Sequence, residues 1–151
     1  AFAAATSGAL HGLMARACGG SALETGTAEA VGTGFALVGL VRAIGHHRAQ
    51  GRVLLPADLL AAEAVSVDDI LAARAAGELD RVTERILDRA EALLAGAAAR
   101  GPFRRRLLPG LLPARLARRQ ARRLRRAPMA PASRDAWSVP DLVWSWLWRR
   151  I

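Results

Sequence analysis

The sequence predicts an all-α domain, and three observations support this prediction. Alanine and leucine dominate a chain of 151 residues that is 52% hydrophobic, and β-branched residues are few, so helix is favoured almost everywhere. Residues that start or stop helices recur along the chain. No segment shows the alternating pattern of a strand. A chain of this length is enough for one domain with a modest core.

The first half of the chain predicts two helices rich in small residues. The first is expected over residues 2–18, and Gly19 and Gly20 are a strong signal for its end. The second is expected over residues 22–43 and contains four glycines. Each glycine would weaken an isolated helix by about 1 kcal/mol relative to alanine, so this helix makes sense only where neighbouring helices or a ligand approach it closely.

The stretch "RAIGHHRAQGRVLLP", residues 42–56, follows the second helix. We expect a loop from Gly45 to Pro56, and Pro56 suits the first turn of a short helix. Ser66 is expected to cap the next helix, over about 67–76.

The second half predicts helices of a different composition. Asp80 is expected to cap a long helix over 81–99. A strongly basic helix is expected over 114–126, followed by a Pro- and Ala-rich linker and a short Trp-rich helix. We therefore expect residues 1–126 to form a helical unit, and residues 127–151 to be the linker and closing helix of the same domain.

Charge is distributed unevenly along the chain. Residues 1–99 carry eight Arg and eleven acidic residues, whereas residues 100–126 carry eleven Arg and no acidic residue. This run, Arg100–Arg126, has three interpretations: a solvated helix face, a surface for anionic membranes, or a nucleic-acid site. No nucleic-acid motif or interleaved aromatic residue accompanies it, which disfavours the third. Four tryptophans near Arg149 and Arg150 favour peripheral membrane contact, with packing of the tryptophans on the bundle as an equal alternative.

Other features narrow the class of protein. A single cysteine, Cys18, excludes an intrachain disulfide, and we expect it to be a buried packing thiol. No apolar run reaches the roughly 18 residues that span a bilayer.

Residues 26–56 resemble the second signature of the squalene/phytoene synthase family. In that family a helix carries Gln-x-x-Asn-x-x-Arg-Asp-x-x-x-Asp and is followed by Gly-Arg-x-Tyr-Leu-Pro. Arg42 falls on the family arginine, and Gly51-Arg52 and Leu55-Pro56 fall on the turn. The opening "FAAATSGALHGLMA" also resembles the family's Tyr-containing Ala-Gly helix. The resemblance implies a helical bundle of isoprenoid-synthase type, of which we expect this chain to be the C-terminal half.

The chain departs from the family at the metal-binding positions. Family members join two prenyl diphosphates head to head, and carboxylates hold the Mg²⁺ ions that neutralise the departing diphosphate. Ala43 and His47 stand where the resemblance places two of these carboxylates, and Ala36 and Gly39 replace the Gln and Asn. Mg²⁺ requires oxygen ligands, so we expect no catalytic residue, metal site or cofactor here.

Basic side chains occur next to the altered metal-binding positions. Arg42 and Arg52 are candidates for a remnant anion- or diphosphate-binding site, because guanidinium suits phosphate; a structural ion pair, for example to Asp58, is the alternative. His46 and His47 do not predict a transition-metal site, since adjacent residues diverge by about 100° on a helix and nearby arginines would repel a cation.

One branch of the family assists assembly of respiratory complex I in mitochondria. This chain is similar to that branch, which also lacks the metal-binding carboxylates. The counterparts here are Val41-Arg42-Ala43, His46-His47, Arg52 to Pro56, and a segment from Val139-Pro140 to Trp146 and Arg149-Arg150. We therefore expect a non-catalytic assembly or scaffold protein with complex I assembly partners and no nucleic acid. It would be cytoplasmic or peripheral on the inner membrane, on the matrix side in a mitochondrion. The alternative is an active prenyl diphosphate transferase with Mg²⁺, whose carboxylates come from a half of the fold outside this chain.

Overall fold

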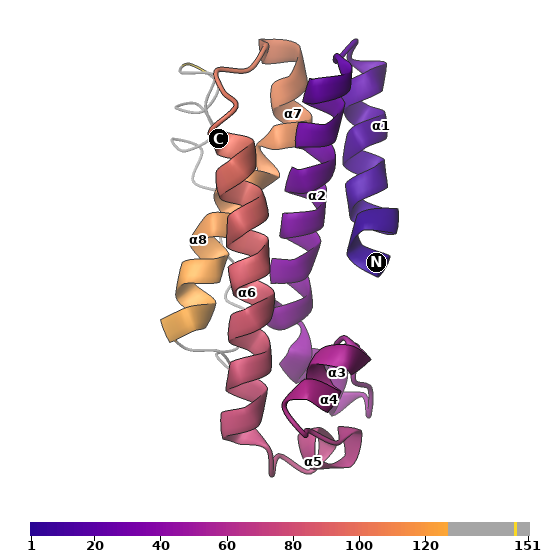
Figure 1. Ribbon diagram of the computed structural model, residues 1–151, viewed down its shortest axis with the longest axis vertical. Helices are drawn as coiled ribbons and strands as arrows, with labels where there is room; N and C mark the ends of the chain where they lie inside the picture. Colours follow the sequence, from indigo (N-terminus) through magenta and orange to yellow (C-terminus); the bar gives the residue numbers. More distant parts are fainter. Residues whose placement is uncertain (127–146, 148–151) are drawn as a thin grey trace.

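The computed structural model describes residues 1–126 and Leu147, and all regular structure in these residues is helical, which confirms the all-α prediction (Figure 1). The elements in chain order are a π-helical turn η1 (Ala4–Gly8), α1 (Ala9–Ala17), α2 (Ala22–Arg42), α3 (Ile44–Ala49), α4 (Ala57–Ala62), α5 (Val67–Leu71), α6 (Ala76–Ala98), a 3₁₀ turn η2 (Arg105–Leu107), α7 (Leu108–Leu111) and α8 (Pro113–Arg126).

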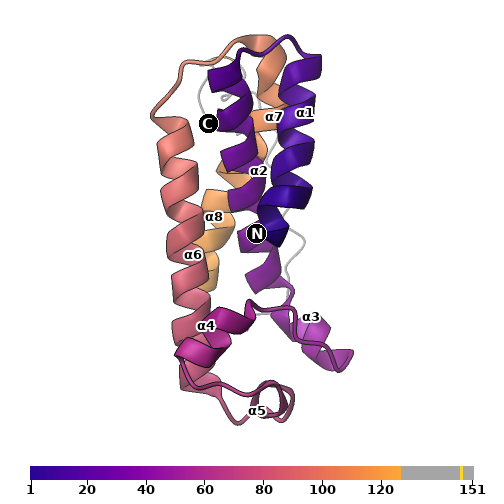
Figure 2. The same cartoon turned by 45° about the vertical axis from the view of Figure 1, so that its right-hand side comes forward.

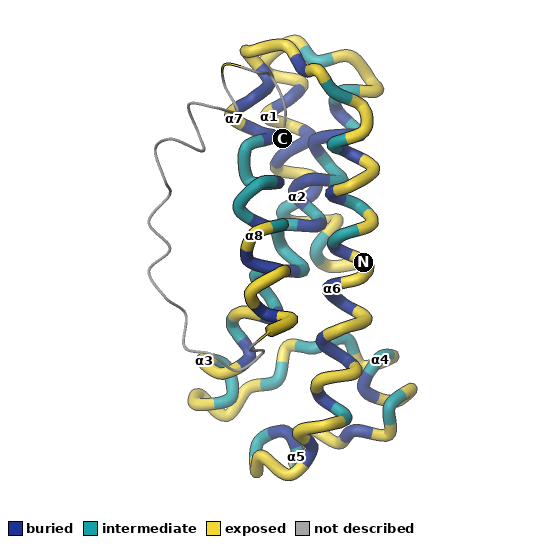
Figure 3. The backbone as a smooth tube through the Cα atoms, turned by 90° about the vertical axis from the view of Figure 1, so that its left-hand side faces the viewer, coloured by how far each residue is buried: buried dark blue, intermediate teal, exposed yellow. Residues whose placement is uncertain are grey.

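Helix α2 is the centre of the bundle (Figures 1 and 2). It packs against η1 and α1 on one side and against α6 and α8 on another, and α7 contacts its beginning and α1. Helices α3, α4 and α5 lie together at the end of the bundle where α2 finishes. The core follows this arrangement (Figure 3). Its largest fully buried apolar side chains are Val31, Val38, Val41, Ile70, Val82, Ile86, Leu87, Leu94, Leu108 and Leu111.

The glycines of α2 serve close packing along part of the helix, as the sequence predicts. A Cβ at Gly34 would lie 2.8 Å from Leu94 Cγ on α6, and one at Gly32 would collide with the Ser7 carbonyl and the His11 ring. Ser21 begins the helix with a reciprocal cap, since its hydroxyl accepts from the Glu24 N–H and the Glu24 carboxylate accepts from the Ser21 N–H. The helix therefore depends on its neighbours more than on its own propensity.

Three expected boundaries are wrong. The expected loop from Gly45 contains α3, because Ala43 keeps a helical conformation and the chain bends without unwinding. The helix expected over 67–76 ends at Leu71, because Ala73 adopts a left-handed conformation with φ of 60°. The helix expected over 81–99 begins at Ala76, so Asp80 lies inside it and is not its cap. Buried Leu79 explains the early start, since it extends the apolar stripe by one turn.

The remaining expectations have mixed outcomes. Ser66 caps α5 as expected, with its hydroxyl accepting from the Asp69 N–H at 3.0 Å. Cys18 is exposed, so its expected burial is wrong. In the described part of the chain no helix is long and apolar enough to cross a membrane. The expected linker at 127–136 and the closing Trp-rich helix lie outside the described residues, except for Leu147, which is exposed.

Candidate functional site

The site predicted from the sequence lies where α2 passes into α3. The Ala43 carbonyl accepts a hydrogen bond from the His47 N–H at 2.9 Å, so these two residues are one helical turn apart. Ala36 and Gly39 precede them at helical spacing and are half-buried. A Cβ at Gly39 would meet no atom within 4 Å. The four positions therefore form a stripe of small side chains that ends at an imidazole.

A glycine turn then brings Arg52 back over α3. Gly51 has φ of +68°, a conformation that glycine adopts without the strain of a side chain. Its N–H donates to the Arg48 carbonyl and the Arg52 N–H donates to the His47 carbonyl, both at 2.9 Å. This is the Schellman arrangement that commonly ends a helix. The Gly-Arg pair is thus a helix stop that sets the position of the arginine relative to His47.

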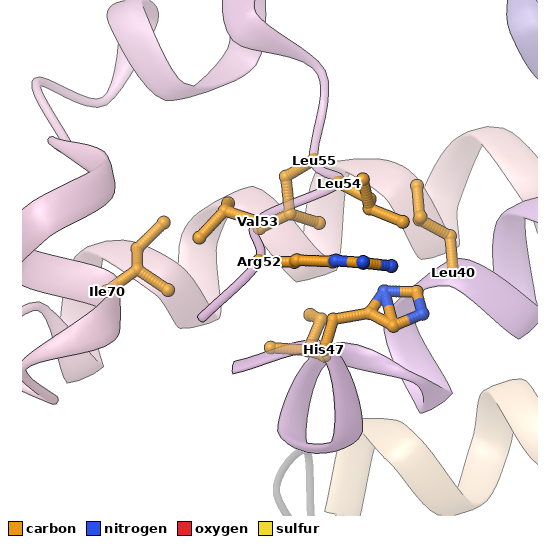
Figure 4. A pocket seen from close by; sticks show the side chains of 8 residues that line it. Leu40, His47, Arg52, Val53, Leu54, Leu55 and Ile70 are labelled. Carbon is orange, nitrogen blue, oxygen red and sulfur yellow. The ribbon is translucent and has the colours of Figure 1, made fainter. Parts of the chain in front are cut away.

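Arg52 and His47 share a shallow surface pocket that is partly open to solvent. Figure 4 shows the Arg52 side chain extended beside the His47 ring, with Leu40 and Leu54 at the same end and Ile70 at the other. The pocket therefore combines a basic wall with apolar walls. Its apolar residues are Leu40, Ile44, Val53, Leu54, Leu55 and Ile70.

The charge around the pocket is positive. No acidic residue occurs between Glu29 and Asp58 in the sequence, whereas three arginines and two histidines do. The three arginines are Arg42, Arg48 and Arg52. Within residues 1–126 their side chains make no ion pair, so the alternative ion pair to Asp58 is not formed. The His46 side chain is hydrogen-bonded to the Gln50 amide at 3.1 Å. The local field therefore favours an anion.

The residues at this site do not fit Mg²⁺. The groups in the pocket that carry heteroatoms are an imidazole and a guanidinium, whereas Mg²⁺ takes oxygen ligands, and a guanidinium repels a cation. Among residues 1–126 and Leu147, no group of three or more His, Cys, Asp or Glu side chains is placed to hold an ion.

The structure brings together only part of the residues that the sequence predicts. His47 and Arg52 face one pocket, whereas exposed Arg42 at the end of α2 is not among the lining residues. The contribution of Leu40 and Ile70 was missed, because Ile70 comes from α5 and nothing in the local sequence links it to α3. The one signal that could have placed Arg52 over His47 is Gly51, whose left-handed conformation is typical of a Schellman end.

Comparisons with known proteins give one result that bears on this geometry. A family model described as squalene/phytoene synthase matches residues 1–145, nearly the whole chain. Searches among curated proteins and among solved structures each found no significant match. The helical architecture agrees with the isoprenoid-synthase fold implied by the sequence resemblance. The chain belongs to the squalene/phytoene synthase family.

Proposed function

We propose that the chain is a non-catalytic member of its family that serves as an assembly or scaffold protein near a membrane. One observation carries the proposal: Ala43 and His47 lie one turn apart, where the family resemblance places two metal-binding carboxylates. Methyl and imidazole groups cannot replace them for Mg²⁺, because this ion takes oxygen ligands. Without the ion, the charge that develops on a departing diphosphate has no metal counterion at this helix.

The proposed assembly role is supported by two features together: the metal-binding positions are altered, and the turn and glycines around them remain. The Gly51 turn and Arg52 remain, and so do the glycines that fit α2 between its neighbours. The complex I assembly branch that the sequence resembles has the same combination of a retained frame and altered metal positions. We propose complex I biogenesis as the process, on the inner membrane surface that faces the cytoplasm or the mitochondrial matrix.

Restoring the carboxylates tests the proposal. The double variant Ala43→Asp/His47→Asp is compared with Gly45→Asp/Ala49→Asp, which adds two carboxylates at the same spacing on exposed positions of α3. Calorimetric titration with Mg²⁺ is expected to show binding by the first variant and none by the wild type. Equal Mg²⁺ affinity in the wild type and in Ala43→Asp/His47→Asp would contradict the proposal.

The basic wall of the pocket favours a second role for the same site. We propose that His47 and Arg52 bind an anionic group without a metal ion, because both line the pocket and neither makes a side-chain hydrogen bond or ion pair with another described residue. Pyrophosphate in the presence of EDTA is the probe. Arg52→Gln should weaken its binding by at least tenfold, and Arg48→Gln is the matched control outside the pocket. An equal effect of both variants would contradict a specific site.

The rival function is an active prenyl diphosphate transferase. The pocket gives it one supporting observation, since apolar Leu40 and Leu54 lie beside Arg52, as an alkyl chain and its diphosphate would require (Figure 4). Its metal carboxylates would come from protein outside this chain. Under this alternative, Ala43→Asp/His47→Asp would leave Mg²⁺-dependent turnover by the full-length protein almost unchanged.

A further inference from the structure

Helix α8 concentrates positive charge on its outer side. It carries seven arginines within Pro113–Arg126, and no acidic residue occurs between Glu91 and Asp135. Arg118, Arg122 and Arg126 follow one another at intervals of four residues, so they form one row along the helix. Arg122 and Arg126 are exposed and Arg118 is half-buried, and none of the three is paired within the described chain.

The acidic groups nearest to α8 are already engaged. Arg125 reaches toward α6, where its guanidinium donates to Asp88 Oδ1 at 2.6 Å and to Glu91 Oε2 at 3.1 Å. These hydrogen bonds raise the pKa of Arg125 above its ordinary value, with the bond to Asp88 as the largest cause. The contact of Arg125 with α6 therefore leaves the charge of Arg118, Arg122 and Arg126 in place.

The apolar side of α8 is used by the bundle. Ala114, Ala117 and Ala121 are fully buried, Leu124 is almost so, and the helix contacts α2 and α6 through this side. An amphipathic helix that binds a bilayer by insertion needs its apolar face free. Helix α8 can therefore attract a partner only through charge.

We propose that the outer face of α8, defined by Arg118, Arg122 and Arg126, rests on an anionic lipid bilayer without inserting into it. Lipid headgroup phosphates offer a plane of negative charge, which suits a straight row of arginines. A single-stranded nucleic acid fits less well, since residues 104–136 contain no aromatic side chain on which bases could stack, and the only amide of α8, Gln120, is buried. The face shares no residue with the His47–Arg52 pocket, so the inference is independent of the proposed anion site.

The test is co-sedimentation of the full chain with lipid vesicles. Vesicles of phosphatidylcholine alone are compared with vesicles that also contain phosphatidylglycerol, over a series of salt concentrations. We expect binding only to the anionic vesicles and its loss at high salt, because exposed charges are screened within a few ångströms at about 1 M. Binding to neutral vesicles, or binding that persists at high salt, would indicate insertion and overturn the proposal.

Matched variants locate the surface. Arg118→Gln/Arg122→Gln/Arg126→Gln removes the row with little change in helix propensity, and should weaken vesicle partitioning about 100-fold. Arg16→Gln/Arg74→Gln/Arg89→Gln removes the same net charge from exposed positions elsewhere. It should change partitioning by less than about fivefold, since only charge near the surface contributes strongly. Equal losses in both variants would show a net-charge effect and contradict the assignment to α8.

Two further measurements separate simple charge attraction from arginine-specific contacts and from nucleic-acid binding. Arg118→Lys/Arg122→Lys/Arg126→Lys keeps the charge and should retain vesicle partitioning within about threefold. This result is expected whether or not the glutamine variant folds normally. A loss as large as that of the glutamine variant would overturn a purely electrostatic contact. Single-stranded RNA added to the bound vesicles should not displace the protein at equal phosphate concentration. Complete displacement would assign α8 to nucleic acid instead.

Discussion

The middle and the C-terminal end of α2 differ in how the surrounding chain meets them. Near its middle, Gly32 and Gly34 are pressed between η1–α1 on one side and α6 on the other. Near its end, Gly39 has open space around it, and Ala43 leads into short helices and a basic turn. The first region fixes the bundle through close contacts that tolerate no extra atom. The second is held by buried Val41 and Ile44 and by the backbone hydrogen bonds of the turn that ends α3.

The close packing and the candidate site therefore occupy different parts of one helix. The positions that the family resemblance assigns to metal binding lie near the end of α2, where side chains contribute little to the packing of the bundle. A methyl group and an imidazole at these positions cost the fold little, because no buried polar side chain among the described residues is left without a partner. The bundle can therefore form with a methyl group and an imidazole at these positions, as the proposed scaffold role requires.

The largest effect is expected from a methyl group in the enclosed region. Gly32→Ala would place a Cβ against the Ser7 carbonyl and 2.8 Å from His11 Cγ. Backbone cannot move aside as a flexible side chain can, so we expect a loss of about 3 kcal/mol in the free energy of unfolding. Urea denaturation measures it. A loss below about 0.5 kcal/mol would show that η1 and α1 are loosely held.

Removing a buried hydrogen bond in the same region should cost somewhat less. His11 Nδ1 lies 2.7 Å from the Gly110 carbonyl oxygen, and the nitrogen must be the donor because a carbonyl only accepts. The bond links α1 to α7 across most of the chain. His11→Phe keeps a ring but leaves the carbonyl unpaired, which should destabilise the protein by about 2 kcal/mol. Thermal melting of the two proteins gives the comparison, and equal midpoints would contradict it.

In the open region, the same glycine substitution should act in the opposite direction. Gly39→Ala adds a methyl group where no atom lies within 4 Å, so only helix propensity changes. We expect a gain of up to about 1 kcal/mol in stability, measured beside Gly32→Ala under the same conditions. Destabilisation by Gly39→Ala would mean that this stripe is covered in the protein, and the contrast between the middle and the end of α2 would fail.

The smallest effect concerns an ion pair that ties α4 to α6. Glu63 follows α4, and its carboxylate accepts from Arg81 at 2.8 Å and from Arg85 at 3.1 Å. The hydrogen bond from Arg81 is the main cause that lowers the pKa of Glu63 below its ordinary value of 4.5. The carboxylate therefore adds stability above about pH 4.5, and this contribution is lost as the pH falls through the lowered pKa.

Glu63→Gln isolates this contribution. The melting temperatures of wild type and variant should differ most at neutral pH and converge as the pH falls below 4.5. The difference should be small because both arginines are more than half exposed. A difference that grows toward acid pH would contradict the pKa direction.

The fold was predictable where a residue type signals the backbone it needs. Gly19 and Gly51 have positive φ and end helices. The stop at Gly19 is expected from the sequence, whereas Gly51 is expected within a loop and instead ends α3. Ala64 and Ala73 end helices in the same way, with φ of 53° and 60°, but alanine carries no such signal. The end of α5 was therefore missed.

From the sequence, only the positions at which the family's metal-binding carboxylates are replaced could be predicted. The spacing of Ala43 and His47 follows from helix geometry, and the structure preserves it. The pairing of His47 with Arg52 depends on the turn at Gly51, and the apolar wall depends on α5, which is distant in sequence from Leu40. Long-range packing of this kind cannot be read from a local motif.

One measurement tests the central claim most directly. The full-length protein is incubated with a prenyl diphosphate and Mg²⁺, and released pyrophosphate is followed with and without EDTA. If the bundle has lost its metal chemistry, release should equal that of the buffer control under both conditions. Saturable release that requires Mg²⁺ and stops with EDTA would contradict the claim and identify the protein as an active prenyl diphosphate transferase.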